Sequence, residues 1–541
     1  MRGAPVARAS AVWGRLSVSI RQAYGAGRPR ERHPVPDVAV VALAVTVAIA
    51  VRVGPSGWSG LAIVFAISAA RWRVTFALVV VSVAMVGVVR SDRAWDALAP
   101  DAVGPYEGWV LIVDDPQPYG GSTRVIVEVG GERFETWHRG RAARIRAGRW
   151  RAGERVLVAG ERRPLDPERR ERVAWQHVVG RFELEWASDV TAGRPIDRAS
   201  NRVRAAIERG AAHLPGDDGA LFRGLVVGDD RDQPPAMIDR FRASGLSHLT
   251  AVSGQNVSFV LAAAGPFLVR MRAGPRWFVT VALIAWFVSL TRFEPSIVRA
   301  GVMAALSATG FVLGRERAPF RLLCWAVVGL LLIDPLLAWS VGFWLSVGAT
   351  AGVTTLGPWL ARHLSVLGPL ALPVGITLGA QAGVLVPLVA VFGSVPLVSL
   401  PANLLAVPVA GFVMLYGLPA GLLAGALPLV APVVMFPCRI GVRWVDTVAA
   451  LATRVEPGGT ATIVGWVVVA VSGMWLVAFA HRREGYARAM NVPHPPPQPD
   501  PPIPDPNVPP PYRPPLPGEP DPGPIMPEPG PAPQPGPNPA P

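Results

Sequence analysis

Long apolar runs, separated by short loops that carry arginine, occupy two stretches of this sequence. Three runs fall within residues 38–89, and about nine more fall within residues 247–480. Each run can cross a bilayer if flanking residues reach the interface, and the arginines of successive loops fall on alternate sides. The pattern predicts a polytopic α-helical protein of the cytoplasmic membrane, with about 12 transmembrane or re-entrant helices and both termini in the cytoplasm.

Residues 90–199, between the two apolar stretches, follow a different pattern. Short runs such as 109–113 and 124–129 alternate between apolar and polar residues, and Gly or Pro clusters separate them. This alternation is typical of short β-strands joined by turns. We expect a small extracytoplasmic β-barrel or sandwich after the third span, followed over residues 200–246 by an amphipathic helical segment in which one helix ends at Gly228.

The two ends of the chain differ from the rest. Residues 1–37 are strongly basic and are expected to form a cytoplasmic N-terminus. Residues 481–541 hold 26 of the 58 prolines, so this tail cannot bury a core and is expected to be extended and disordered in the cytoplasm. A tether is favoured over a docking site for a proline-binding partner.

Composition adds two limits to this picture. All 52 basic residues are arginine and the formal net charge is +14, which basic cytoplasmic loops explain more simply than a nucleic-acid ligand does. The two cysteines, Cys324 and Cys438, lie in apolar surroundings. Neither a disulfide framework nor a cysteine zinc site is therefore predicted, and no cofactor is expected.

Polar residues inside apolar spans are costly, so they indicate where function lies. The densest group stands at the start of the fourth span and contains His248, Ser253, Gly254, Gln255 and Asn256. Any one of them alone would be a helix-packing residue. Together they require water, a ligand or a polar partner.

Arg299 is a second polar interruption, about one turn into an apolar run that follows Glu294 and Pro295. An arginine at this depth must reach the interface, pair with an acid such as Glu294, or face a water-filled path. In such a path it could touch a phosphate. The ion pair and the path are equally open alternatives.

Two further groups interrupt later spans: Gly342, Phe343 and Ser346 in one, and Pro401, Asn403 and Pro408 in another. Proline breaks helices, and broken helices at membrane depth line cavities or are buried in protein. We therefore expect a channel, with the spans near 336–357, 400–425 and 431–453 either crossing fully or re-entering.

Taken in order, these motifs resemble the competence domain of ComEC-type proteins. The order runs from Gly228-Asp229 through residues 248–257, 295–300 and 342–346 to residues 403–408. Residues 90–199 likewise resemble that family's oligonucleotide-fold (OB-like) loop. The resemblance implies a channel that carries single-stranded DNA across the membrane during natural transformation. It also implies that residues 248–256 and Arg299 line the path, and that Asn403 and Pro408 lie at a broken helix.

Relatives in this family often continue into a metallo-β-lactamase-like domain with a His-x-His-x-Asp-His motif. None of the eight histidines forms that motif, and no other residue cluster meets the requirements of a metal site. We expect a short form that is not an enzyme. A phosphate-binding GxxxxGK[ST] loop is also absent. The resemblance therefore implies a membrane DNA receptor, a cytosolic ATP-driven motor and a separate nuclease as partners, with a homo-oligomer left open.

Basic charge in the outer domain is concentrated over residues 139–172, with 12 arginines and 5 acids. Single-strand binding combines a basic groove with aromatic faces. Contact with DNA would involve Trp137, Arg139, Arg141, Arg144, Arg146 and Trp150. The favoured alternative is that the tryptophans fill a β core or lie at the membrane interface while the arginines face lipid headgroups.

A second class of function stays open. A transporter or membrane scaffold for a lipid-linked or anionic small molecule could be built on the same fold. Fold similarity does not determine the cargo.

Overall fold

The computed structural model describes residues 37–53, 74–119, 121–250, 254–313, 318–393, 395–469, 471–473 and 475. The basic N-terminal segment, the expected second span at 57–70 and the proline-rich tail lie outside these residues.

Helices α2 (Asp37–Val53), α4 (Val74–Asp96) and α14 (Pro319–Ile333) share one apolar cluster, in which Val47, Val80 and Leu331 are fully buried. Helix α4 runs seven residues past the expected end at residue 89. Two polar side chains in this extension bind neighbouring helices. Ser91 Oγ donates to the carbonyl of Val51 at 2.9 Å, and Arg90 Nη2 donates to that of Ile333 at 2.9 Å.

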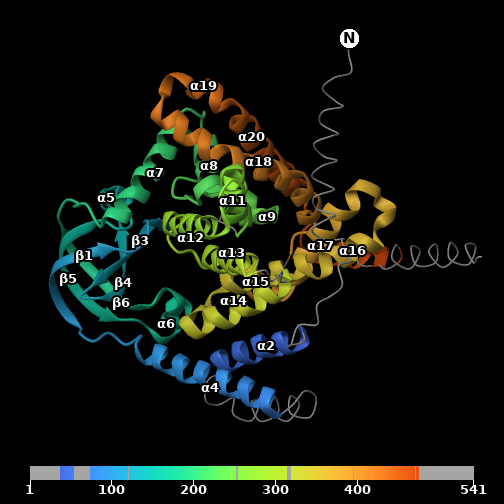
Figure 1. Cartoon of the computed structure of the whole chain (residues 1–541). Helices are drawn as coiled ribbons and strands as arrows, with labels where there is room; N and C mark the ends of the chain where they lie inside the picture. The colour runs from blue at the N-terminus through green and yellow to red at the C-terminus, as the bar shows by residue number, and fades with distance from the viewer. Residues whose placement is uncertain are drawn as a thin grey trace, which may run out of the picture. The chain divides into compact units, whose positions relative to one another are not determined.

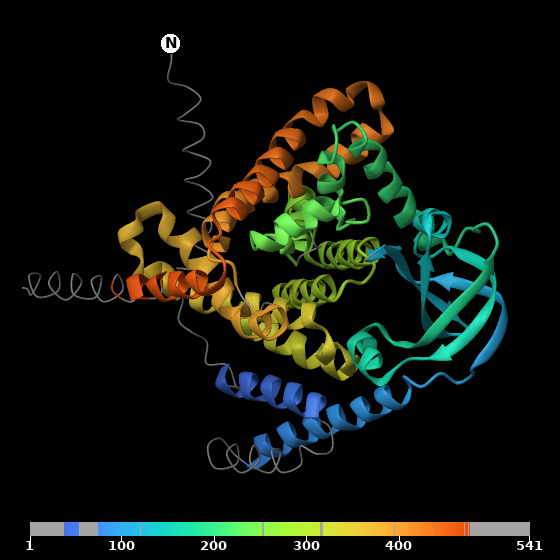
Figure 2. The ribbon, with the colours of Figure 1, turned by 180° about the vertical axis from the view of Figure 1, so that it is seen from behind.

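The outer domain contains six strands: β1 (Gly104–Ile112), β2 (Gln117–Tyr119), β3 (Ser122–Val129), β4 (Glu132–Arg139), β5 (Arg155–Pro164) and β6 (Val178–Ala187). They pair in the order β1-β5-β6-β4-β3-β2, and β1 also pairs with β3. Five strands thus close into a small barrel, which Figures 1 and 2 show from opposite sides. Only β4 and β6 pair in parallel. The expected small β domain is confirmed.

Alternate residues of the strands fill the barrel. Val110, Phe134, Val156 and Phe182 all point inward and are at most 1% exposed. The same cluster includes Leu336 from the 3-10 helix η3 (Pro335–Trp339), which follows α14. The barrel core is therefore completed by a residue from the helical region.

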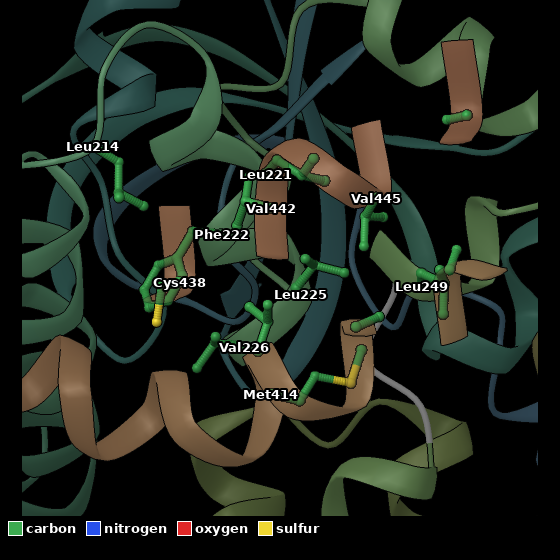
Figure 3. Close-up of a cluster of buried hydrophobic side chains, with 14 of the residues drawn as sticks. Leu214, Leu221, Phe222, Leu225, Val226, Leu249, Met414, Cys438, Val442 and Val445 are labelled. Carbon is green, nitrogen blue, oxygen red and sulfur yellow. The ribbon is translucent and has the colours of Figure 1, made fainter. Parts of the chain in front are cut away.

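A second large core joins α7 (Pro195–Ala211), α8 (Asp218–Val227), α9 (Pro235–Ala243), α18 (Ser399–Ala426) and α20 (Phe436–Val455). Figure 3 shows Phe222 and Leu225 of α8 in one cluster with Met414 of α18 and Val442 of α20. Because α8 is buried on nearly all sides, its C-terminus has a fixed position.

The remaining long helices are α11 (Gly254–Leu268), α12 (Ala273–Leu290), α13 (Pro295–Val312), α15 (Val341–Thr354), α16 (Leu356–His363) and α17 (Ala371–Phe392). Helices α15 and α17 meet through a pair of Gly-x-x-x-Gly motifs, Gly348/Gly352 and Gly379/Gly383. A Cβ atom on Gly352 would overlap the carbonyl oxygen of Gly379. Small residues allow such close helix contact in membrane proteins.

Four of the described helices are long and apolar enough to cross a membrane: residues 273–290, 295–312, 365–391 and 399–426. A bent pair covering residues 428–455 would be a fifth span, and several described helices are apolar but shorter. On α17, Val386 is 78% exposed and Val391 is 50% exposed, as expected for a lipid-facing surface. The described part of the chain thus holds several candidate spans, without giving the expected total of 12.

The expected break at Pro401 and Pro408 was wrong. Helix α18 runs unbroken from Ser399 to Ala426. Pro401 lies in its first turn, where backbone N–H groups have no helical partner, so proline is tolerated there. Pro408 leaves the carbonyl of Leu404 without its helical donor. The neighbouring carbonyl, that of Leu405, accepts a hydrogen bond from Trp444 Nε1 of α20 at 3.0 Å. The bend instead lies between 428–434 and 436–455, at 49°.

Candidate functional site

Arg299 of α13 and Ser346 of α15, which belong to two separate sequence motifs, are in direct contact. The Nε and Nη2 atoms of Arg299 donate to Ser346 Oγ at 3.0 and 2.5 Å. Gly254, from a third motif, packs on the same point of α13. A Cβ atom there would lie 2.8 Å from Ala300 Cβ and 3.1 Å from Arg299 Nη2. Three predicted motifs thus meet at one buried arginine.

Within the described ranges, the partners of Arg299 are neutral. Its side chain is 4% exposed, and Nη1 lies 3.1 Å from the sulfur of Met303. Glu294, the acid expected as its partner, is an exposed residue at the N-cap of α13, and no ion pair joins the two among the described residues. A buried guanidinium without a carboxylate is costly. Of the alternatives for Arg299, the pair with Glu294 is therefore not formed.

The other residues of these motifs shape the helix starts. Pro295 occupies the first turn of α13. Ser340 Oγ accepts the backbone N–H of Phe343 at 3.2 Å, which begins α15. Phe343 is fully buried, whereas Gly342 is exposed. These residues position Arg299 and Ser346.

Asn256 connects the motif of α11 to the end of α8. It is 3% exposed, and its Nδ2 lies 3.5 Å from the carbonyl oxygen of Leu225. Helix α8 ends at Gly228, which has a left-handed φ of 66°, as the sequence predicted. The next residue, Asp229, is 5% exposed and begins a buried network of charges.

Asp229 is surrounded by arginines. Its two carboxylate oxygens accept hydrogen bonds from Arg231 at 2.7 Å each, and Arg204 and Arg223 lie 3.9 Å away. Although burial alone would raise it, these guanidinium groups hold the pKa of Asp229 below its usual value. The carboxylate of Asp229 therefore holds the chain after α8 to the arginines around it.

The network reaches the barrel through Asp115, which follows β1. Arg204 of α7 lies 2.9 Å from Asp115, and Arg292, in the α12–α13 loop, lies 3.2 Å from it. Arg292 also donates to Asn201 Oδ1 at 2.6 Å. Arg292 and Phe293 have left-handed φ values of 61° and 57°, a costly conformation that the surrounding bonds maintain.

Two adjacent carboxylates in this network have pKa values shifted in opposite directions. Burial would raise the pKa of Asp115, but Arg204 and Arg292 hold it well below the usual range. For Asp114, burial and then the negative charge of Asp115 raise the pKa to about 6. No group of three or more His, Cys, Asp or Glu side chains in the described part of the chain is arranged to hold a metal ion.

Asp115, Arg204 and Arg292 were missed by the sequence analysis. One signal was available for Arg204, because the buried stripe of α7 contains Ser200, Arg204 and Ile207 at helical spacing. An arginine on the buried face of an amphipathic helix requires an acidic partner. Its partner could not be identified, since Asp115 is 89 residues away in sequence.

The polar run at residues 247–256 is only partly described. His248 lies on the one-turn helix α10 (Ser247–Thr250) and is exposed, while Ser253 and the side chain of Gln255 lie outside the described residues. Their expected place along a path remains a prediction.

Asn403 bonds to the backbone of its own helix. Its Nδ2 donates to the carbonyl of Ser399 at 2.7 Å, and the side chain is 9% exposed. Ser399 Oγ in turn accepts a hydrogen bond from Gln381 Nε2 of α17 at 3.0 Å. Asn403 therefore lies in a continuous helix rather than at the broken helix that the resemblance implied.

The basic and aromatic residues of the outer domain separate into two groups. Trp150 is 3% exposed and packs edge-on against His138 in the barrel core, and Trp137 packs against Tyr119 and Arg169. By contrast, the arginines on and beside α5 (Arg141–Gly148) are exposed: Arg139, Arg141, Arg144 and Arg146. The core alternative is therefore correct for Trp150, and the surface arginines remain candidates for an anionic partner.

Comparisons with known proteins agree with this geometry. The family model described as "Competence protein" matches residues 225–484, which contain Asn256, Arg299, Ser346 and Asn403. ComE operon protein 3 of Bacillus subtilis is 28% identical over 199 residues, covering 36% of this chain and 25% of that protein. Competence protein ComA of Neisseria gonorrhoeae is 29% identical over 362 residues, covering 61% of this chain and 50% of that protein.

A third relative, the uncharacterized protein YcaI of Escherichia coli, is 28% identical over 208 residues, covering 35% of this chain and 27% of that protein. The matches thus span a quarter to a half of the length of these relatives, and no solved structure matches. The apolar helices and the matched domain together indicate a membrane protein. Residues 225–484 therefore form a domain of the competence-protein family, and parts of the chain are similar to ComE operon protein 3 and competence protein ComA.

Proposed function

We propose that this chain is a membrane channel through which single-stranded DNA crosses the cytoplasmic membrane during natural transformation. The observation that carries the proposal is the position of Arg299. This guanidinium is buried, has neutral described partners and lies where three competence motifs meet. A passing phosphate supplies the negative charge that the described surroundings of Arg299 lack.

The outer barrel supports the same proposal. A closed five-stranded barrel with one parallel pair fits an OB-like domain, a fold that binds oligonucleotides. The exposed arginines of α5 would meet the incoming strand first. Phosphate contacts of this kind are independent of sequence, which suits uptake of DNA of any origin.

The proposal includes the arrangement in the membrane and the partners. The chain would be a multi-pass protein with both termini in the cytoplasm. It would receive DNA from a membrane receptor and be driven by a cytosolic ATP-dependent motor, with strand hydrolysis performed by a separate nuclease rather than by this chain. Assembly into a homo-oligomer is compatible with the proposal.

A transporter or scaffold for a lipid-linked or anionic small molecule is the second candidate, because Arg299 would also suit that cargo. Substitution separates the two functions. We expect Arg299→Ala and Asn256→Ala to abolish uptake of labelled DNA into a nuclease-resistant form while the protein stays at normal abundance in the membrane. Normal uptake by Arg299→Ala at normal abundance would favour the second candidate.

A further inference from the structure

A cleft of about 290 Å³ opens between the barrel and α7. The chain before β5, the segment after β6 and one face of α7 form its walls. Its charged and polar lining consists of Arg151, Glu154, Arg198, Asn201 and Arg202. This cleft is separate from the Arg299 site and is not used in the function proposed above.

Two arginines of the cleft form no ion pair with another described residue. Arg198 and Arg202 lie one turn apart on α7, are exposed, and enter none of the ion pairs found within the described ranges. Arg151 differs, because its Nη2 lies 2.7 Å from Glu208. Glu154, the acid of the lining, accepts the backbone N–H of Arg151 at 2.8 Å. The cleft is therefore positively charged.

The floor of the cleft is fixed. Gly153 and Gly193 are in such close backbone contact that a Cβ atom on Gly193 would overlap the carbonyl of Gly153. Thr191 and Arg155 exchange backbone hydrogen bonds at 2.7 and 3.0 Å. Asn201 Nδ2 donates to the carbonyl of Ala152 at 3.1 Å, which joins α7 to this floor. A ligand would find its binding groups already placed.

An aromatic surface adjoins the cleft on the outer face of β1, β5 and β6. Trp109 is 52% exposed and Trp186 is 50% exposed. Three outward residues of β5 connect the two features. Arg155 pairs with Thr191 at the cleft. Leu157 then pairs with Trp109, and Ala159 pairs with Trp186. Successive outward positions are about 6.6 Å apart along a strand. Charge thus lies at the cleft end and aromatic rings lie beyond it.

We infer that this cleft binds the phosphodiester backbone of a single DNA strand, with Arg198 and Arg202 on the phosphates and with bases stacked on Trp109 and Trp186. Guanidinium groups suit phosphate oxygens, and exposed rings take any unpaired base. The inference rests on the proposed DNA cargo and gives the barrel a surface other than α5 for it. In a duplex the ring faces are covered by the neighbouring stacked base pairs, so the surface selects a single strand.

Phosphodiesters also occur in lipid headgroups, so the test compares both. The full-length protein in neutral detergent is titrated with a fluorescent 20-nucleotide oligothymidine, with the matching duplex, and with vesicles of zwitterionic or anionic phospholipid. The variants are Arg198→Gln/Arg202→Gln, Arg198→Lys/Arg202→Lys and Trp109→Ala/Trp186→Ala. A matched control removes two exposed arginines of α20, Arg439→Gln/Arg454→Gln.

We expect the glutamine pair to weaken single-strand binding at least tenfold and to reduce the slope of log K against log salt by about 1.4, the value for two lost phosphate contacts. The lysine pair should keep most of the affinity, and the tryptophan pair should lose at least fivefold. The α20 control should stay within about twofold of wild type.

Three results would overturn the inference: equal losses in the glutamine pair and the control, equal binding of duplex and single strand, or binding of anionic vesicles alone. Failure here is distinguishable from failure of the channel proposal. If the glutamine pair binds and transforms normally while Arg299→Ala does not transform, only the cleft assignment falls.

Discussion

Arg204 of α7 and Asp115 of the barrel form a buried ion pair, with Nη2 and Oδ2 2.9 Å apart. The same guanidinium donates to the carbonyls of Val227 and Leu290, at 3.3 and 3.2 Å. One side chain therefore connects the barrel to the end of α8, just before the Gly228-Asp229 motif, and to the end of α12. This relation explains how the barrel is held to the competence domain.

Removal of Asp115 should be strongly destabilising. Asp115→Ala removes the nearest carboxylate of Arg204 and of Arg292, and breaking a buried pair in this way costs about 3–5 kcal/mol. Thermal unfolding of the detergent-solubilised protein measures the loss. Glu183→Gln, which breaks an exposed pair with Arg163, is the control and should change little. Equal effects of the two variants would contradict the anchoring role.

Stability should depend on pH through Asp114. Its pKa is raised to about 6 from 3.8, so the folded state favours the neutral form. The contribution of neutral Asp114 to the stability of the folded state is complete below about pH 3.8 and is lost as the pH rises through 6. The free energy of unfolding of Asp114→Asn, measured relative to wild type, should therefore rise by about 2–3 kcal/mol as the pH is raised from 4 to 7.5. A gain that does not change with pH would contradict this assignment.

Ser346→Ala should be milder than Arg299→Ala. The alanine removes the hydroxyl that orients the guanidinium but keeps the charge. Uptake should fall severalfold in Ser346→Ala and vanish in Arg299→Ala, at equal protein abundance in the membrane fraction. If loss of the hydroxyl abolishes uptake and loss of the charge does not, the guanidinium is not the acting group.

Close contact between α15 and α17 should not tolerate a side chain. Gly352→Ala places a methyl group against the carbonyl of Gly379, which must separate the helices. We expect a marked loss of folded protein in the membrane, measured by size-exclusion chromatography. Gly274→Ala in α12 is a matched control, since nothing lies within 4 Å of its Cβ position. Similar behaviour of both variants would contradict the contact.

The sequence pattern was sufficient where local rules dominate. The outer domain forms short strands as predicted, β1 and β5 alternate in burial over most of their length, and α8 ends at Gly228. The pattern failed where tertiary context dominates. Pro408 was expected to break a helix, but α18 continues through it, packed in one core with α7, α8 and α20. The burial of Trp150 agrees with the favoured alternative, but its contact with His138 could not be predicted, because it depends on barrel closure.

The candidate site was predicted in its members but not in its contacts. Gly254, Arg299 and Ser346 were each identified as motif residues. Their meeting depends on how α11, α13 and α15 pack, which no spacing along the chain encodes. The Asp115–Arg204 pair was missed for the same reason, since its partners are distant in sequence.

The most direct test of the channel is transformation of a strain from which the gene for this chain has been deleted. Linear marked DNA is supplied to the parent, to the deletion strain and to the deletion strain carrying either the wild-type chain or Arg299→Ala. We predict transformants only from the parent and the wild-type complement. Transformation of the deletion strain at the parental rate would contradict the account.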